Sequence, residues 1–102
     1  DRTRDGGTAL HKAVGRKRKD VIGLLLKRGA DINAKDKYGY TPLHWAVSSK
    51  SKEMVELLVD RGADVNARNI QGKTPLYYAW GGSGADREIA EILKSHGGTG
   101  GF

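Results

Sequence analysis

The stretch GGSGA at residues 81–85 nearly matches the G-x-S-x-G pattern around a nucleophilic serine, with Ala85 in place of the last glycine. That pattern requires a strand before the serine, whereas we expect residues 74–80 to form a helix. No histidine and acid are spaced in a recognisable way to complete a triad. A dinucleotide-binding loop also fails, because Arg87 stands where its fingerprint needs a glycine. The sequence therefore predicts neither catalysis nor nucleotide binding here.

The carboxylate pairs Glu53/Glu56 and Glu88/Glu91 have a spacing of three residues, which could serve acid–base catalysis inside a cleft. Basic residues are interleaved with them, a pattern typical of solvated helix faces with local ion pairs.

The three histidines are too few and too scattered for a metal cluster, and the absence of cysteine removes thiolate ligands and disulfides. We therefore expect no enzyme activity, no metal site and no cofactor.

The composition favours one soluble globular domain. The chain has 102 residues, of which 37% are hydrophobic and 29% charged. Its longest apolar run is about three residues, far short of a membrane span, and no signal-peptide pattern is visible. We expect an intracellular protein, in a compartment that the sequence does not indicate, that is either a monomer or part of a longer chain.

Two blocks of sequence recur at an interval of 33 residues. GGTALHKA, GYTPLHWA and GKTPLYYA share threonine, leucine and alanine in register, and KRGADINAK is repeated later as VDRGADVNAR. A fixed period of this length indicates stacked structural units, each unable to bury its own apolar face. The predicted boundaries are about 3–35 for repeat 1, about 36–68 for repeat 2 and about 69–98 for repeat 3.

One unit can be described from local signals. Gly39 indicates a tight turn with a positive φ angle, and Thr41 followed by Pro42 predicts a helix N-cap with proline at the first helical position. A second helix is expected over residues 53–61, ended by Gly62. Each unit is therefore predicted as turn, helix, turn, helix.

Repeat 3 departs from the others, because its second helix aligns with that of repeat 2 at an offset of 35 residues. We expect two extra residues within 81–86, which lengthen the helix–helix turn, with Asp86 or Ser83 as the next N-cap. The tail at 97–102, GGTGGF, is expected to be flexible. Tyr77, Tyr78 and Trp80 are predicted either to cap this end of the stack, which we favour, or to widen the binding surface.

The repeated motif resembles that of the ankyrin repeat family, T-P-L-H-x-A. Residues 41–46, TPLHWA, match every fixed position, whereas the other copies have Ala9 for proline and Tyr77 for histidine. The resemblance covers nearly the whole chain. It implies an all-α solenoid forming a single domain over residues 1–102, with three stacked turn–helix–turn–helix units and short β-turn fingers. It also implies a structural role for His11 and His44.

The resemblance further implies a non-enzymatic protein–protein interaction module, with a concave surface made of turn tips and first helices. The residues of this sequence that map to that surface are Lys35, Lys37, Tyr38, Tyr40, Trp45, Ser48, Ser49, Arg68, Ile70, Gln71, Lys73 and Tyr78. This set is mostly basic and aromatic, so we expect a protein partner with an acidic, partly apolar patch. We favour partner contact for Tyr38 and Tyr40, whereas Trp45 and Tyr78 fit core packing and partner contact equally well.

Positive charge is concentrated in the N-terminal half of the chain. The net charge is +6, and residues 1–50 carry 12 Lys and Arg against 5 Asp and Glu, which gives +7. The densest run is Arg16, Lys17, Arg18 and Lys19. It predicts either a solvated turn on a terminal repeat, which we favour, or a patch that binds polyanions or nucleic acid.

Overall fold

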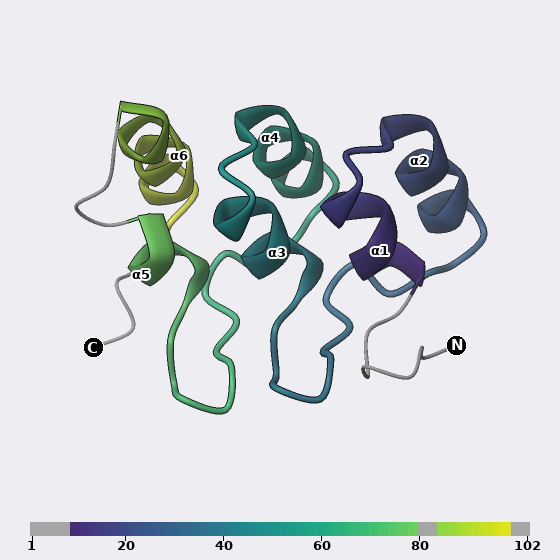
Figure 1. The fold of residues 1–102 in the computed structure, drawn as a ribbon, viewed down its shortest axis with the longest axis horizontal. Helices are drawn as coiled ribbons and strands as arrows, with labels where there is room; N and C mark the ends of the chain where they lie inside the picture. The colour runs from purple at the N-terminus through teal and green to yellow at the C-terminus, as the bar shows by residue number, and fades with distance from the viewer. Residues whose placement is uncertain (1–8, 80–83, 99–102) are drawn as a thin grey trace.

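The computed structural model describes residues 9–79 and 84–98. Within them it contains six α-helices: α1 (Ala9–Gly15), α2 (Lys19–Lys27), α3 (Pro42–Ser48), α4 (Lys52–Asp60), α5 (Pro75–Ala79) and α6 (Gly84–Ser95). The helices form three antiparallel pairs that stand side by side (Figure 1). The predicted all-α stack of three units is therefore confirmed.

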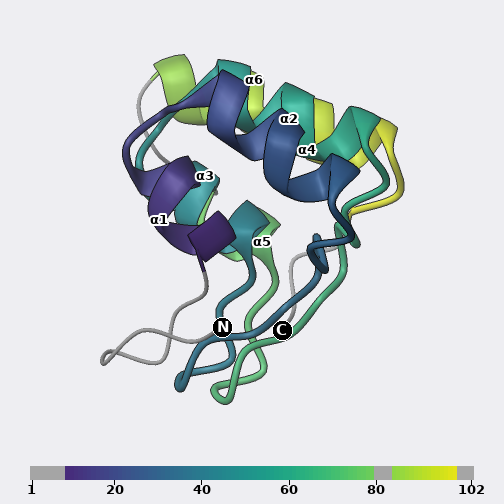
Figure 2. The same cartoon turned by 90° about the vertical axis from the view of Figure 1, so that its right-hand side faces the viewer.

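The helices form two layers. The first helices α1, α3 and α5 pack on one another in one layer, and each packs on the second helix of its own repeat. Two loops project from the first-helix layer as fingers, roughly across the helix direction (Figure 2). The first finger, residues 36–40, precedes α3, and the second finger, residues 69–73, precedes α5. Each is closed by a backbone hydrogen bond, from Asp36 N to Tyr40 O and from Asn69 N to Lys73 O.

Local signals set the helix ends. The Thr41 side chain caps α3 by accepting a hydrogen bond from the backbone N–H of His44, and Pro42 is the first helical residue, as predicted. Helix α4 begins at Lys52, one residue earlier than expected, because the Ser51 side chain accepts the Met54 N–H. At the other end Gly62 has φ +92°, as its position after the helix predicted.

The core is built from the same positions in each repeat. Buried leucines of the first helices alternate with small alanines that let neighbouring helices approach closely. These residues are Leu10, Leu43, Leu76, Ala13, Ala46 and Ala79. The second helices add the buried residues Ile22, Met54, Val55, Leu58, Ile89 and Leu93. On α2 the apolar side chains of Val21 and Leu24 remain 36% and 49% exposed.

The region around the expected insertion differs from the sequence prediction. Residues 84–86 already belong to α6, so Asp86 lies inside the helix and the prediction that it is the N-cap is wrong. The other candidate, Ser83, and the proposed capping residue Trp80 lie outside the described residues. In the tail, Gly98 N–H donates to Leu93 O, so residues 97–98 are held against α6. The rest of the tail is not among the described residues.

Histidine side chains link successive repeats. His11 Nε2 lies 2.7 Å from Tyr40 O, and His44 Nε2 lies 3.0 Å from Lys73 O, one repeat further on. The backbone N–H of Thr41 donates to His44 Nδ1, so the proton of the neutral ring is on Nε2, which donates to the Lys73 carbonyl. The predicted structural role of these histidines is confirmed, and it joins neighbouring repeats as well as stabilising one unit.

Stability should fall in mild acid because of His44. Burial lowers the pKa of His44 from its ordinary value of 6.5, so the unfolded chain binds the proton more readily than the folded one. The stabilisation is complete above about pH 6.5 and is lost as pH falls below it, through the lowered pKa. Urea unfolding at pH 7.5 and pH 5 should show this loss. His44→Gln should cost about 1–3 kcal/mol at pH 7.5 and flatten the dependence; equal pH dependence in both proteins would contradict the assignment.

Gly39 should be required for stability by its close surroundings as well as by its φ of +80°. A Cβ there would lie 2.8 Å from Ile70 N and 2.9 Å from Asn69 Cα, in the adjoining finger. Gly72 has nearly the same φ, +77°, but open space around it, so it is a matched control. We expect Gly72→Ala to cost about 1–2 kcal/mol and Gly39→Ala a further 1–3 kcal/mol in chemical denaturation. Equal costs would mean that the fingers do not touch.

Candidate protein-binding surface

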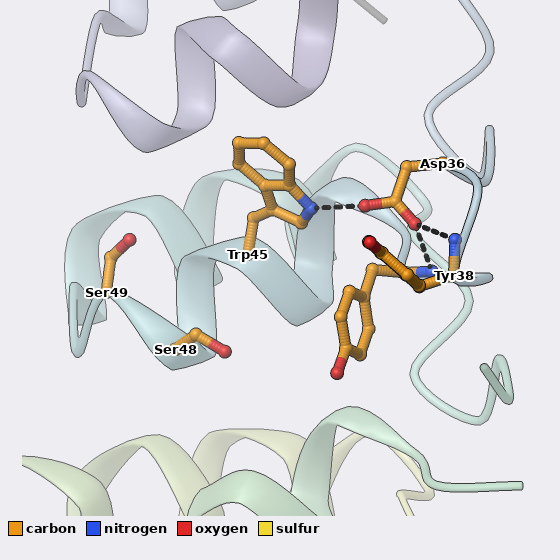
Figure 3. Close-up of a pocket in the computed structure, with 6 residues that line it drawn as sticks. Asp36, Tyr38, Trp45, Ser48 and Ser49 are labelled. Atoms are coloured by element: carbon orange, nitrogen blue, oxygen red, sulfur yellow. Dashed lines mark hydrogen bonds between the residues drawn. The ribbon is translucent and has the colours of Figure 1, made fainter. Parts of the chain in front are cut away.

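A hollow of about 390 Å³ lies between the first finger and α3, and we call it the first hollow. The described residues that line it are Asp36, Tyr38, Tyr40, Trp45, Ser48 and Ser49. Figure 3 shows the Trp45 indole and the Asp36 carboxylate pointing toward one another, with Ser48 and Ser49 further along the helix. The hollow therefore has an aromatic end at the finger and a hydroxyl-bearing end at the C-terminus of α3.

Asp36 organises the first finger and fixes Trp45. One carboxylate oxygen, Oδ1, accepts the backbone N–H groups of Tyr38 and Tyr40, both at 2.9 Å. The other, Oδ2, accepts the Trp45 indole N–H at 3.1 Å. The residue is buried, so these three donors offset the cost of removing its charge from water. An aspartate three residues before a glycine is a usual turn signal, but Asp36 was not among the predicted site residues, because nothing local indicates its bond to Trp45.

Asn69 organises the second finger as Asp36 organises the first, but its side chain donates a hydrogen bond to the aromatic residue instead of accepting one. Its Oδ1 accepts the N–H groups of Gln71 and Lys73 at 2.9 and 3.0 Å, and its Nδ2 donates to the Tyr78 hydroxyl at 2.7 Å. In repeat 2 an indole donor meets a carboxylate, whereas in repeat 3 an amide donor meets a phenol oxygen. Each finger residue is therefore matched to the aromatic residue nine positions later.

A smaller hollow of about 210 Å³ lies beside the first, and we call it the second hollow. The described residues that line it are Tyr38, Tyr40, Asn69, Ile70 and Gln71. Tyr38 and Tyr40 line both hollows, so this pair, with ring centroids 6.3 Å apart, forms a tyrosine ridge between them. Tyr38 is 49% exposed and Ile70 is 73% exposed, which leaves apolar surface at both finger tips.

The predicted surface residues separate into two groups. The hollows bring together Tyr38, Tyr40, Trp45, Ser48, Ser49, Ile70 and Gln71. The residues not found among the described linings are Lys35, Lys37, Arg68, Lys73 and Tyr78. Trp45 is half-buried, packs on the core and lines the first hollow, so core packing and surface lining coincide in one residue. Tyr78 is half-buried and also packs on the core.

Three lysines of the second group make defined contacts at the fingers or near them. The Lys35 ammonium donates to Arg68 O at 2.9 Å and so joins the chain segments that lead into the two fingers. The Lys37 ammonium lies 5.1 Å from the Tyr38 ring centroid, and that of Lys73 lies 4.3 Å from the Tyr77 ring centroid. Positive charge is therefore held next to exposed aromatic faces.

Tyr77 is a surface aromatic that sequence reasoning assigned to a cap. It is 39% exposed, whereas His11 and His44 at the equivalent positions are buried. Its ring meets that of Tyr78 edge to face at 5.2 Å, and Tyr78 meets Tyr40 at 6.0 Å, so a row of tyrosines extends from the ridge into repeat 3. The replacement of histidine by tyrosine was the available signal.

The basic run occupies the turn between α1 and α2 and the first residue of α2. All four side chains, Arg16 to Lys19, are exposed. The Lys19 ammonium pairs with Glu53 of the next repeat, which holds the pKa of that carboxyl below its ordinary value. Lys52 pairs in the same way with Glu88 at 2.9 Å, one repeat further on. These exposed pairs contribute little to stability but recur with the stack.

Within residues 9–79 and 84–98, no group of three or more His, Cys, Asp and Glu side chains is arranged to hold a metal ion. None of the helices described is both long enough and apolar enough to cross a membrane.

The matched pairs at the two fingers can be tested by exchanging them. Asp36→Asn should place an amide N–H against the Trp45 indole N–H and cost about 1–3 kcal/mol, because a buried donor loses its acceptor. In a Trp45→Tyr background the same change recreates the pair that Asn69 makes with Tyr78 and should cost less. A double-mutant cycle in urea measures the difference. Additive costs would show that the two positions are not coupled.

Comparison with known proteins agrees with the repeat pattern. A family model described as ankyrin repeats (3 copies) matches residues 1–69 and 39–99. The crystal structure of the ankyrin repeat domain of Bcl-3, described as a unique member of the IkappaB protein family, is similar with a TM-score of 0.89 and 41% sequence identity. The match covers 96% of this chain and 42% of that one, so this chain spans less than half of its length.

A comparison with curated protein sequences gave no significant match. The family match covers well over half of the chain, and the structural similarity includes all three repeats. The chain therefore belongs to the ankyrin repeat family, whose members are non-enzymatic binding modules.

Proposed function

We propose that this chain binds another protein through the two hollows and the tyrosine ridge, and that the partner presents an acidic, partly apolar patch. The observation that carries the proposal is the pair of adjoining hollows with Tyr38 and Ile70 exposed at their rims. Exposed apolar surface gathered at one place usually marks an interaction site, and tyrosine is a frequent interface anchor. The intracellular location stays a prediction.

The charge around the hollows supports an acidic partner. Lys37 and Lys73 lie within the fingers, Lys35 and Arg68 directly precede them, and the Lys37 ammonium is held against the Tyr38 ring. Asp36 is the acidic residue among the described linings, but it is buried and accepts three N–H donors. Its charge is therefore largely compensated within the chain, and the cations dominate what a partner meets.

Polyanion or nucleic-acid binding by the basic run is the second candidate, favoured by the exposure of Arg16, Lys17 and Arg18. The backbone N–H groups of these three residues supply no hydrogen bonds to such a ligand, because they already donate to carbonyls of α1. Lys19 is engaged with Glu53. Binding there would depend on flexible side chains alone, so we favour the protein partner.

Affinity capture with the chain as bait tests the protein-binding proposal. Tyr38→Ala combined with Tyr40→Ala should weaken binding of the captured partner about tenfold or more, since anchor residues contribute over about 1.4 kcal/mol. Tyr38→Ala alone serves as a second variant, because that side chain is half exposed and its loss should leave the fold intact. Leu24→Ala, on α2, is the matched control for losing an exposed apolar side chain. Unchanged capture by the tyrosine variants would contradict the proposal.

An oligonucleotide titration at two salt concentrations separates the two candidates. Binding that weakens with salt and disappears in an Arg16→Ala, Arg18→Ala variant would support the polyanion alternative. Absence of salt-sensitive binding would exclude it.

A further inference from the structure

We propose that the partner contributes one extended segment that crosses the tyrosine ridge and places an apolar side chain in each hollow. This inference rests on the proposed function and specifies the form of the ligand. It also predicts the ligand's sequence: two apolar residues separated by one other, with a carboxylate beside them.

The position of the ridge requires a ligand that passes over it. Apart from Tyr38 and Tyr40, the first hollow is lined mainly from α3, whereas the second is lined by residues 69–71 of the next finger. No lining element other than the first finger is shared between the described parts of the two hollows. A ligand that fills both must therefore cross the tyrosine pair.

An extended backbone suits this crossing better than a helix. In an extended chain, side chains at alternate positions point to the same side, so two of them can enter hollows on either side of a narrow ridge. A helix is a cylinder about 10–12 Å wide with its side chains, and it would rest on the exposed Tyr38 ring. The unequal volumes, about 390 and 210 Å³, favour a larger anchor in the first hollow and a smaller one in the second.

The ridge is already held in place before any ligand binds. The backbone N–H groups of Tyr38 and Tyr40 donate to Asp36, and the Tyr40 ring packs on those of His44 and Tyr78 at 5.6 and 6.0 Å. Ile70 N–H donates to Tyr38 O at 3.1 Å and so fixes the second finger against the first. A preformed surface of this kind loses little conformational entropy on binding, so two small anchors suffice for measurable affinity.

Polar groups indicate what surrounds the anchors. The first hollow ends at the Ser48 and Ser49 hydroxyls, and the second includes the exposed Gln71 side chain, all able to bond a peptide backbone. The Lys37 ammonium stands over Tyr38 at the ridge itself, where it can reach a carboxylate on a crossing segment. The ligand's acidic residue is therefore expected next to the apolar pair.

Selection from a displayed library of random linear 12-residue peptides tests the inference on the wild-type chain. Enriched peptides should carry the apolar pair with an adjacent Asp or Glu. In calorimetric titration, replacing either apolar residue by alanine should raise the Kd about tenfold or more, as burial of one such side chain predicts.

Variants that fill one hollow give the sharper test. Ser48→Phe should block the first hollow and Gln71→Trp the second, and both side chains are exposed, so the fold should tolerate the changes. Each variant should weaken the selected peptide about tenfold or more, and Lys37→Glu should weaken it by removing the carboxylate's partner. Leu24→Phe, which adds bulk on α2, should leave the Kd unchanged. Thermal melts of all four variants establish that they are folded.

Three outcomes would overturn the inference: no enriched peptide, a selected peptide that is helical when bound, or affinity that is insensitive to filling one of the hollows. These failures are distinguishable from failure of the proposed function. If the captured partner still requires Tyr38 while no peptide is enriched, the extended segment is wrong and protein binding at this surface stands. If capture is also insensitive to Tyr38, both are wrong.

Discussion

The hydrogen bond from a histidine of one repeat to a carbonyl at the base of the next finger is the interaction on which the rest of the structure depends. His11 reaches Tyr40 O and His44 reaches Lys73 O, each from a buried ring in the first-helix layer. Apolar packing alone is not directional and would tolerate sliding between repeats. A buried hydrogen bond with fixed geometry is less tolerant, so it fixes the register of one repeat on the next.

The register of the repeats determines where each finger lies and which residues it contacts. Because each finger is fixed at its base, the backbone of residues 69–70 comes close to Gly39, and Ile70 N–H donates to Tyr38 O. Asp36 and Asn69 then shape the fingers and fix one aromatic side chain each on the helix behind. The first hollow lies within one repeat, between its finger and α3, whereas the second exists only because two neighbouring repeats bring their fingers together, so the candidate surface as a whole is a property of the stack.

Much of the fold could be predicted because its signals are local. Thr41 with Pro42, Gly39 and Gly62 each act on the adjacent backbone, and the interval of 33 residues repeats them. Seven of the twelve residues predicted for the surface line the hollows, and their role in binding stays a prediction. Asp36 and Asn69 were not among the predicted residues, and Tyr77 was assigned to a cap, because their pairings form only in the folded chain. Asp86 was misplaced because helix α6 begins earlier than the preceding repeat indicated.

The sequence by itself determined the helix pairs, their turns and the family, because capping, turn geometry and apolar periodicity depend on neighbours within one unit. It also determined that the surface would be basic and aromatic. Only the tertiary structure decided that Trp45 both packs on the core and lines a hollow. It also decided that the Lys35 ammonium donates to Arg68 O, and that Tyr38 and Tyr40 separate two hollows. These features need contacts between repeats, and no local pattern specifies which side chains meet across a distance of 33 residues.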